Sequence, residues 1–215
     1  MRRLQSDIEN TDFQHRHRLL EGMAQAVAAD GYAGTTIADI VRSASVSRRT
    51  FYEHFSTKAE CFIALYEAAS LGALNVLRDA IDPEHEWQTQ AEQAMIAYLG
   101  CLAQNPILMR TLFIEILGLG MEGLAARRRV NQQIGMFMLS VINTDKNGQP
   151  REPSLSPEMA MAVVGGINEL ILQAIEQDRV SELPGIAQPA IRLLCAVSSG
   201  GTESVSKLSE TTRKK

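Results

Sequence analysis

With 215 residues, 45% of them hydrophobic and 5% aromatic, the chain has enough apolar content for a packed core and favours helices over a β-sandwich. Its formal net charge of −4 argues against a protein that holds nucleic acid through an overall positive charge. The sequence has no run of about 18 apolar residues and no apolar stretch behind its N-terminal arginines, so we expect neither a membrane-spanning helix nor a signal peptide. Three cysteines, Cys61, Cys101 and Cys195, show no disulfide or metal spacing and fit a reducing cytoplasm.

The first predicted helix runs from about residue 13 to residue 30. Leu19, Met23 and Val27 recur at four-residue spacing, which gives this segment one apolar face. Gly31 is a suitable stop, because glycine readily adopts the backbone conformations that end helices. The residues before this helix are polar, and we expect them to fray.

Two short helices joined by a tight turn are predicted between residues 35 and 58. Thr36 and Asp39 have the spacing of a capping box, in which the threonine oxygen accepts from a backbone N–H and the carboxylate reaches back. Ser47 is a good N-cap for the second helix. The segment is therefore expected to hold two helices at a defined angle.

The second of these helices divides its residues by face. Phe51 and Phe55 are four residues apart and point inward together. Another side carries polar residues, which are Arg48, Arg49 and Tyr52, with Thr50 and His54 flanking them. Arginine can pair bidentately with guanine O6 and N7 or grip a phosphate, so this side suits a nucleic acid. Two helices with a short turn, the second polar and basic, are typical of a helix-turn-helix.

The charge of this segment differs from that of the whole chain. Residues 42–58 carry four basic residues against one acidic residue, Glu53. A DNA-binding regulator needs such a local basic patch and not a basic whole.

The run GYAGTTIADIVRSASVSRRTFYEHFSTKAECF, residues 31–62, closely resembles the DNA-binding motif of the tetracycline-repressor (TetR) family of bacterial transcription regulators. The resemblance lies in the Gly-Tyr before the Thr-Thr pair, the Ala-x-Val-Ser turn, the Thr-Phe-Tyr-x-His-Phe helix and the lysine that opens the next helix. The family often has glycine where this chain has Ser45, which indicates a turn that an ordinary residue tolerates or a small strain.

The resemblance implies a role for each matching side chain. The expected phosphate contacts are Thr36, Ser47, Thr50, Tyr52, His54 and Lys58. The expected base readers are Arg48 and Arg49. Phosphate contacts set position and salt dependence, whereas base contacts set the sequence that is bound.

The rest of the chain also reads as helices, so the predicted fold class is all-α. The expected helices cover about 58–81, 84–103, 106–118, 120–142, 156–179 and 185–198. We expect a DNA-binding helix-turn-helix domain of three helices at 1–57, a helical ligand-binding and dimerisation domain at 58–198, and a disordered tail at 199–215. The resemblance implies that the last two helices pair with those of a second copy, although their apolar faces could instead be buried within one chain.

Seven of the nine methionines lie after residue 90, which suits an adaptable apolar pocket but equally suits ordinary core packing. Candidate ligand-binding residues are Met95, Tyr98, Met109, Phe113, Glu115, Phe137 and Asn168. Glu115 stands in an otherwise apolar segment, where it could pair with Arg110 or Arg127, bind a ligand, or reach solvent.

The sequence therefore predicts a cytoplasmic, homodimeric transcriptional regulator, with a repressor as the first expectation. Its expected partners are a double-stranded DNA operator with an inverted repeat and, as the resemblance implies, a small apolar or amphipathic effector that releases it. The alternative is a DNA-binding protein without an inducer, architectural or constitutively dimeric. The sequence shows no catalytic motif, so no enzyme activity, cofactor, metal or membrane contact is expected.

Overall fold

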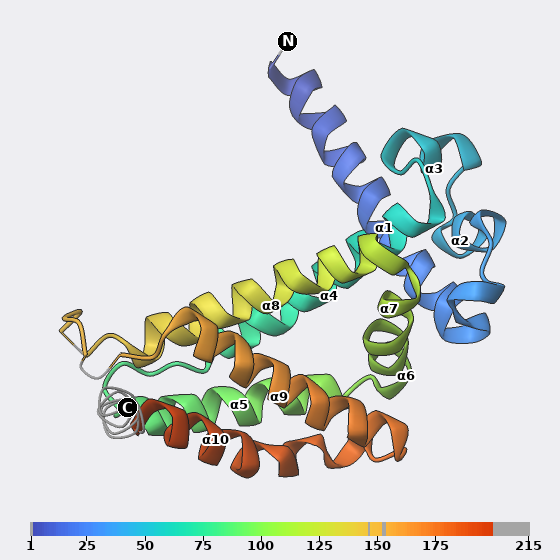
Figure 1. Cartoon of the computed structure of the whole chain (residues 1–215). Coiled ribbons are helices and arrows are strands. Elements are labelled where there is room, and N and C mark those ends of the chain that lie inside the picture. Colours follow the sequence, from blue (N-terminus) through green and yellow to red (C-terminus); the bar gives the residue numbers. More distant parts are fainter. Residues whose placement is uncertain (1, 146, 152–153, 200–215) are drawn as a thin grey trace, which may run out of the picture. The chain divides into compact units, whose positions relative to one another are not determined.

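The computed structural model describes residues 2–145, 147–151 and 154–199, and their regular structure is helical (Figure 1) apart from an isolated β-bridge between Thr144 and Pro150. The predicted all-α fold is confirmed. Residues 200–215, most of the predicted tail, lie outside the described residues.

The chain forms two compact units, each assembled from two stretches of sequence. Unit 1 consists of Met1–Leu71 and Ile107–Arg127, and unit 2 consists of Gly72–Pro106 and Arg128–Lys215. This division differs from the predicted boundary at residue 57, because the fourth helix contributes to both units and a later segment returns to unit 1.

Unit 1 begins with α1 (Arg2–Gly34), α2 (Ile37–Ala44), α3 (Arg48–His54) and the first half of α4 (Lys58–Asp79). Its second stretch holds α6 (Pro106–Arg110), the π-helical turn η1 (Thr111–Glu115), α7 (Ile116–Gly118) and the start of α8 (Gly120–Ile142). The helix expected at 106–118 is thus interrupted by a π-turn, a feature often found at functional positions.

Helix α1 starts earlier than predicted. Residues 2–12 contain no glycine or proline, so nothing in them breaks the helix. Gly31 interrupts α1, as expected, with φ of 69° and ψ of 167°.

The core of the helix-turn-helix depends on a close approach of α1 to α2. A Cβ atom on Gly22 would lie 2.6 Å from the carbonyl oxygen of Ile40, so only glycine fits there. Leu19, Met23 and Phe51 are fully buried within unit 1. The predicted apolar face of α1 is therefore the face that packs.

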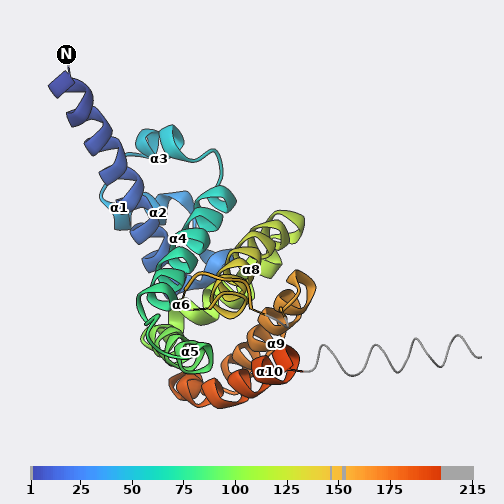
Figure 2. The ribbon, with the colours of Figure 1, turned by 90° about the vertical axis from the view of Figure 1, so that its left-hand side faces the viewer.

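Unit 2 contains α5 (Trp87–Ala103), the rest of α8, α9 (Pro157–Glu176), the 3₁₀ turn η2 (Val180–Ile186) and α10 (Ala187–Ser199). Helix α10 packs against both α5 and α9 (Figure 2). Ser156 caps α9 by accepting from the Met159 N–H, and Pro157 occupies the first turn, where it costs no hydrogen bond. The core is aliphatic, with Leu99, Ile171 and Ile175 fully buried.

Within the described part of the chain, α4 and α9 are long and apolar enough to cross a membrane by length and composition. In each of them 44% of the most apolar window is buried inside the protein. Helices at the core of a folded domain pass the same test, so this carries no membrane assignment.

The turn between α2 and α3 contains a strained residue. Ser45 has φ of 50° and ψ of 46°, the left-handed region that glycine adopts without cost. Its carbonyl oxygen accepts from the Arg18 Nη2 at 2.7 Å, which ties the turn to α1.

We predict that Ser45→Gly raises the free energy of unfolding by about 0.5–1 kcal/mol, because glycine removes the left-handed strain at this position. Ser43→Gly is the matched control. Ser43 is exposed inside α2, so glycine there should destabilise by a similar amount. Urea unfolding of the two variants measures whether each substitution raises or lowers the free energy of unfolding. A Ser45→Gly protein no more stable than wild type would contradict the assigned strain.

Candidate nucleic-acid interface and interhelical cavity

Two capped helix starts fix the position of α3. The capping box at α2 is present, since the Thr36 hydroxyl accepts from the Asp39 N–H and the Asp39 carboxylate accepts from the Thr36 N–H at 2.9 Å. Ser47 Oγ accepts from the Thr50 N–H at 3.0 Å and begins α3 as predicted. Both threonine hydroxyls also hydrogen-bond within these caps, so they are oriented by the fold.

Helix α3 buries its aromatic face and exposes its basic face. Phe51 is completely buried and Phe55 is 4% exposed, whereas the side chain of Arg49 is 89% exposed and Tyr52 is half-exposed. Arg48 is exposed as well. The predicted division of this helix by face is confirmed for these residues.

The two arginines of α3 hold different partners one turn further along the helix. Arg48 Nη2 donates to Tyr52 Oη at 3.3 Å, and its guanidinium carbon lies 5.8 Å from the centre of the Tyr52 ring. Arg49 Nε donates to Glu53 Oε1 at 3.0 Å. The exposed face of α3 therefore presents two pre-oriented guanidinium groups.

The expected outward orientation of His54 is wrong. Its side chain is only 6% exposed, with Nε2 3.6 Å from Asp12 Oδ1 and its ring 6.4 Å from that of His15. Both neighbours lie on α1. Asp12 precedes the first helix predicted from the sequence, so no neighbour that could cover His54 was expected there.

Lys58 is half-buried and engaged within unit 1. Its Nζ donates to the carbonyl oxygens of Tyr32 at 2.7 Å and Thr35 at 2.8 Å, and lies 4.2 Å from the centre of the Tyr32 ring. The ammonium thus caps the chain just after the break in α1. This geometry favours a structural role for Lys58 over the expected phosphate contact.

Glu115 reaches a partner that the sequence did not suggest. Its Oε2 accepts from the backbone N–H of Tyr32 at 2.9 Å, within unit 1. Burial, and secondarily the charge of Glu115, raises the pKa of the Tyr32 phenol, which therefore stays neutral at physiological pH. Met109 and Phe113 also lie in unit 1, so these three candidate ligand residues do not line the cavity described next.

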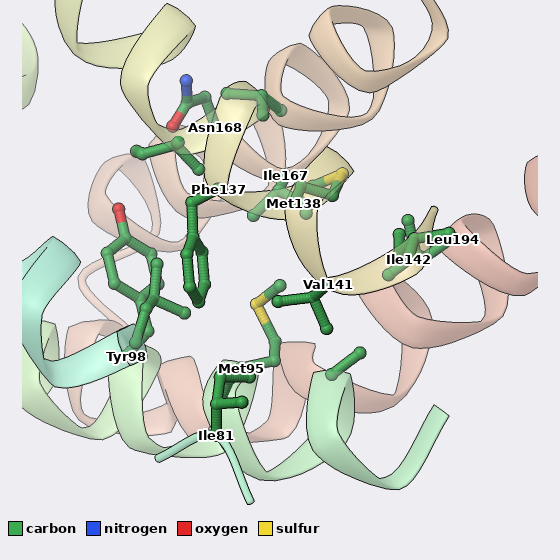
Figure 3. A pocket seen from close by; sticks show the side chains of 15 residues that line it. Ile81, Met95, Tyr98, Phe137, Met138, Val141, Ile142, Ile167, Asn168 and Leu194 are labelled. Atoms are coloured by element: carbon green, nitrogen blue, oxygen red, sulfur yellow. The ribbon is translucent and has the colours of Figure 1, made fainter. Parts of the chain in front are cut away.

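A cavity opens between the helices of unit 2 (Figure 3). Its lining includes four predicted residues, Met95, Tyr98, Phe137 and Asn168. The remaining lining side chains are Leu77, Ile81, Ala91, Ala94, Ile134, Met138, Val141, Ile142, Val164, Ile167 and Leu194. From the sequence alone, aliphatic residues that line a cavity cannot be distinguished from aliphatic residues that fill a core.

The cavity is narrow in this conformation. Its free volume is about 60 Å³, and the space between its walls reaches about 610 Å³ only when the part open to solvent is included. Pockets for drug-sized ligands hold roughly 300–1,000 Å³. Met95 and Phe137 point into it and Met138 also lines it, and flexible thioethers can repack to enlarge such a space (Figure 3).

A buried amide pair supplies polarity at one side of the cavity. Asn168 Nδ2 donates to Asn131 Oδ1 at 3.1 Å, and the two residues are 6% and 9% exposed. Asn168 lines the cavity, whereas its partner Asn131 on α8 is not one of the lining residues. Among the lining residues in the described part of the chain, none carries a charge at neutral pH.

Neither a reactive Cys61 thiol nor a metal-binding cluster is found among the described residues. Burial raises the pKa of the Cys61 thiol to about 12, so this thiol stays protonated and unreactive near neutral pH. No group of three or more His, Cys, Asp or Glu side chains that could hold a metal ion occurs among the residues with described positions.

Residues 19–65 match the sequence model of a family described as "Bacterial regulatory proteins, tetR family". The HTH-type transcriptional repressor AcnR of Corynebacterium diphtheriae is 32% identical to this chain, covering 37% of the chain and 48% of the repressor. The uncharacterized HTH-type transcriptional regulator YxbF of Bacillus subtilis is 33% identical, covering 35% of the chain and 20% of that protein. The chain thus spans about half or less of the length of these curated relatives.

A solved structure is similar over a longer stretch. The transcriptional regulator FadR from Bacillus subtilis, determined in complex with stearoyl-CoA, superposes with a TM-score of 0.68 at 16% identity. The superposition covers 86% of this chain and 98% of FadR. The two proteins share a fold with an N-terminal helix-turn-helix and a C-terminal helical domain.

The structural role of Lys58 can be tested without DNA. We predict that Lys58→Met lowers the free energy of unfolding by about 1–3 kcal/mol, because two carbonyl oxygens lose a charged donor and the Tyr32 ring loses its cation. Arg78→Met is the matched control, since Arg78 is exposed near the other end of α4 and should change stability by less than about 0.5 kcal/mol. Equal urea midpoints for Lys58→Met and wild type would show that this capping contributes nothing.

Proposed function

We propose, on the premise that residues 19–65 match the tetR family of bacterial regulatory proteins, that the chain is a homodimeric transcriptional repressor that binds an inverted-repeat operator and is released by an apolar or amphipathic small molecule. It would act in the bacterial cytoplasm, where both DNA and effector are present. The exposed basic face of α3 carries the proposal.

That face suits a major groove because its hydrogen-bond donors point outward from a helix anchored by buried aromatics. Arg48 and Arg49 supply the base readers, and Tyr52, Thr36, Ser47 and Thr50 supply phosphate contacts. We assign His54 and Lys58 to positioning, because the first is buried and the second is engaged with backbone carbonyls. One helix of seven residues reads few base pairs, so specificity requires a second copy on the next turn of the groove.

The last two helices are the proposed dimer surface. Met159 and Leu193 are large apolar side chains left 41% and 36% exposed on α9 and α10. Gly165 on α9 is exposed, and a Cβ there would meet nothing within 4 Å. A second copy of these helices could approach closely at such a position and cover the apolar side chains.

The uncharged walls of the cavity set the proposed effector class. An apolar body suits the aliphatic lining, and a hydroxyl, carbonyl or amide could reach Asn168 or Tyr98. The similar fold of FadR, which was crystallised with stearoyl-CoA, supports an acyl or comparably apolar effector. Because the free volume is small, such a ligand would have to enlarge the cavity.

The alternative is a DNA-binding protein without an inducer, for which the second unit serves only to dimerise. The narrow cavity is the observation in its favour, since a filled core needs no ligand. The two functions predict the same DNA binding and differ in the response to small molecules.

The DNA-binding function is tested by selecting bound sequences from a random duplex pool at two salt concentrations. We expect an enriched inverted repeat, and we expect Arg49→Ala to cost about 1–3 kcal/mol on that site while relaxing the preference at one base pair. Arg78→Ala is the control, because Arg78 is exposed on α4 within unit 2 and lies outside the basic segment 42–58, so operator affinity and base preference should not change. Binding that enriches no sequence and only weakens in salt would favour the architectural alternative.

The effector site is tested by narrowing the cavity. Ala94 is buried in the cavity wall, so Ala94→Leu should block binding of the effector and leave the affinity for the operator unchanged. Compounds with acyl chains, stearoyl-CoA among them, would be screened for a rise in the melting temperature and for release of the operator. Ala97→Leu, on the same helix but outside the lining, should respond like wild type. Release that survives Ala94→Leu would place the effector elsewhere.

A further inference from the structure

The exposed face of α3 carries an acidic side chain whose role the proposed function does not explain. Glu53 is the only acidic residue between positions 42 and 58, and its side chain is 53% exposed. A carboxylate on a surface that meets phosphates weakens binding to every DNA sequence by like-charge repulsion. Its hydrogen bond to Arg49 offers a compensating use.

The atoms that the two arginines engage differ. Glu53 accepts from Nε of Arg49, which leaves both terminal nitrogens of that guanidinium for another partner. Tyr52 accepts from a terminal nitrogen of Arg48, whose guanidinium also lies over the Tyr52 ring. A bidentate contact to guanine O6 and N7 needs two parallel N–H donors, which the terminal pair of Arg49 provides.

We propose that Glu53 is a positioning residue that orients Arg49 to read a guanine, and that this pair sets the base preference of α3. The inference rests on the proposed DNA-binding function. Arg48, whose terminal nitrogen is engaged with Tyr52, contributes less to base preference. Each half of the operator therefore carries a G·C pair at the position that Arg49 reads.

The strength of the pair depends on its surroundings. In the free protein, an exposed pair four residues apart on a helix adds little to stability, so removing it leaves the unfolding midpoint almost unchanged. At a DNA surface that excludes water, the attraction between the two charges grows. Glu53 then restricts Arg49 to one direction and favours guanine over other bases.

This role gives effects of opposite sign on two DNA molecules. Loss of the carboxylate removes repulsion from phosphates, so affinity for a random duplex rises. It also frees Arg49 to reach phosphates or other bases, so discrimination falls. A residue that served only the stability of α3 would weaken binding to both molecules together.

The experiment compares wild type, Glu53→Gln, Arg49→Ala and the double variant on the selected operator, on its single base-pair variants and on a random duplex. We expect Glu53→Gln to bind the random duplex more tightly and to lose about tenfold of the discrimination at one G·C pair. In the Arg49→Ala background, Glu53→Gln should leave discrimination at that pair unchanged. Asp30→Asn, which removes an exposed charge of unit 1 outside α3, should leave the base preference intact.

The outcomes distinguish failure of the positioning role of Glu53 from failure of the proposed DNA-binding function. If Glu53→Gln keeps the wild-type discrimination on an enriched operator, the positioning role is wrong while the regulator remains. If its effect persists without Arg49, Glu53 reads a base itself and the positioning role is again wrong. If wild type enriches no sequence, the proposed function fails, and this inference fails with it.

Discussion

The organisation of unit 1 depends on how the backbone of Tyr32 is held. The helix α1 breaks at Gly31, and the break leaves polar backbone groups that need partners. The Glu115 carboxylate accepts a hydrogen bond from the Tyr32 N–H. The Lys58 ammonium donates to the Tyr32 carbonyl oxygen and lies over the Tyr32 ring. One residue thus joins the end of α1, the start of α4 and the π-turn η1, which are distant in sequence.

This junction explains why two predicted functional side chains have structural roles. A lysine that opens the helix after the reading helix looks suited to phosphate, and a glutamate in an apolar segment looks suited to a ligand. Each instead satisfies a backbone group within unit 1, where a lost partner would leave a half-buried polar atom uncompensated. The side chains proposed for DNA that remain exposed include Arg48, Arg49 and Tyr52 on α3.

Which contacts could be predicted from the sequence depends on how far apart the contacting residues lie along the chain. The caps at Thr36 and Ser47 and the buried pair Phe51 and Phe55 rest on spacings of three or four residues, so they could be predicted. The burial of His54 depends on a contact 42 positions away along the chain, and the Glu115 contact spans 83 positions, which no local pattern encodes. In the cavity, Met95 and Tyr98 could be chosen for their chemistry, but the aliphatic walls could not be told from core.

The narrowness of the cavity bears on how an effector could release DNA. A ligand shifts a conformational equilibrium only if it binds one state more tightly than the other. With about 60 Å³ of free volume, the described conformation has little room for an acyl chain, so such a ligand would bind a conformation with a larger cavity more tightly. The required difference in affinity between the two conformations then arises from the difference in cavity volume, and no specific contact to a DNA-dependent residue is needed. The buried amide pair beside the cavity would determine which ligands bind the enlarged cavity most tightly. A ligand that breaks the hydrogen bond between Asn168 and Asn131 would have to supply a replacement hydrogen bond to the amide left without its partner.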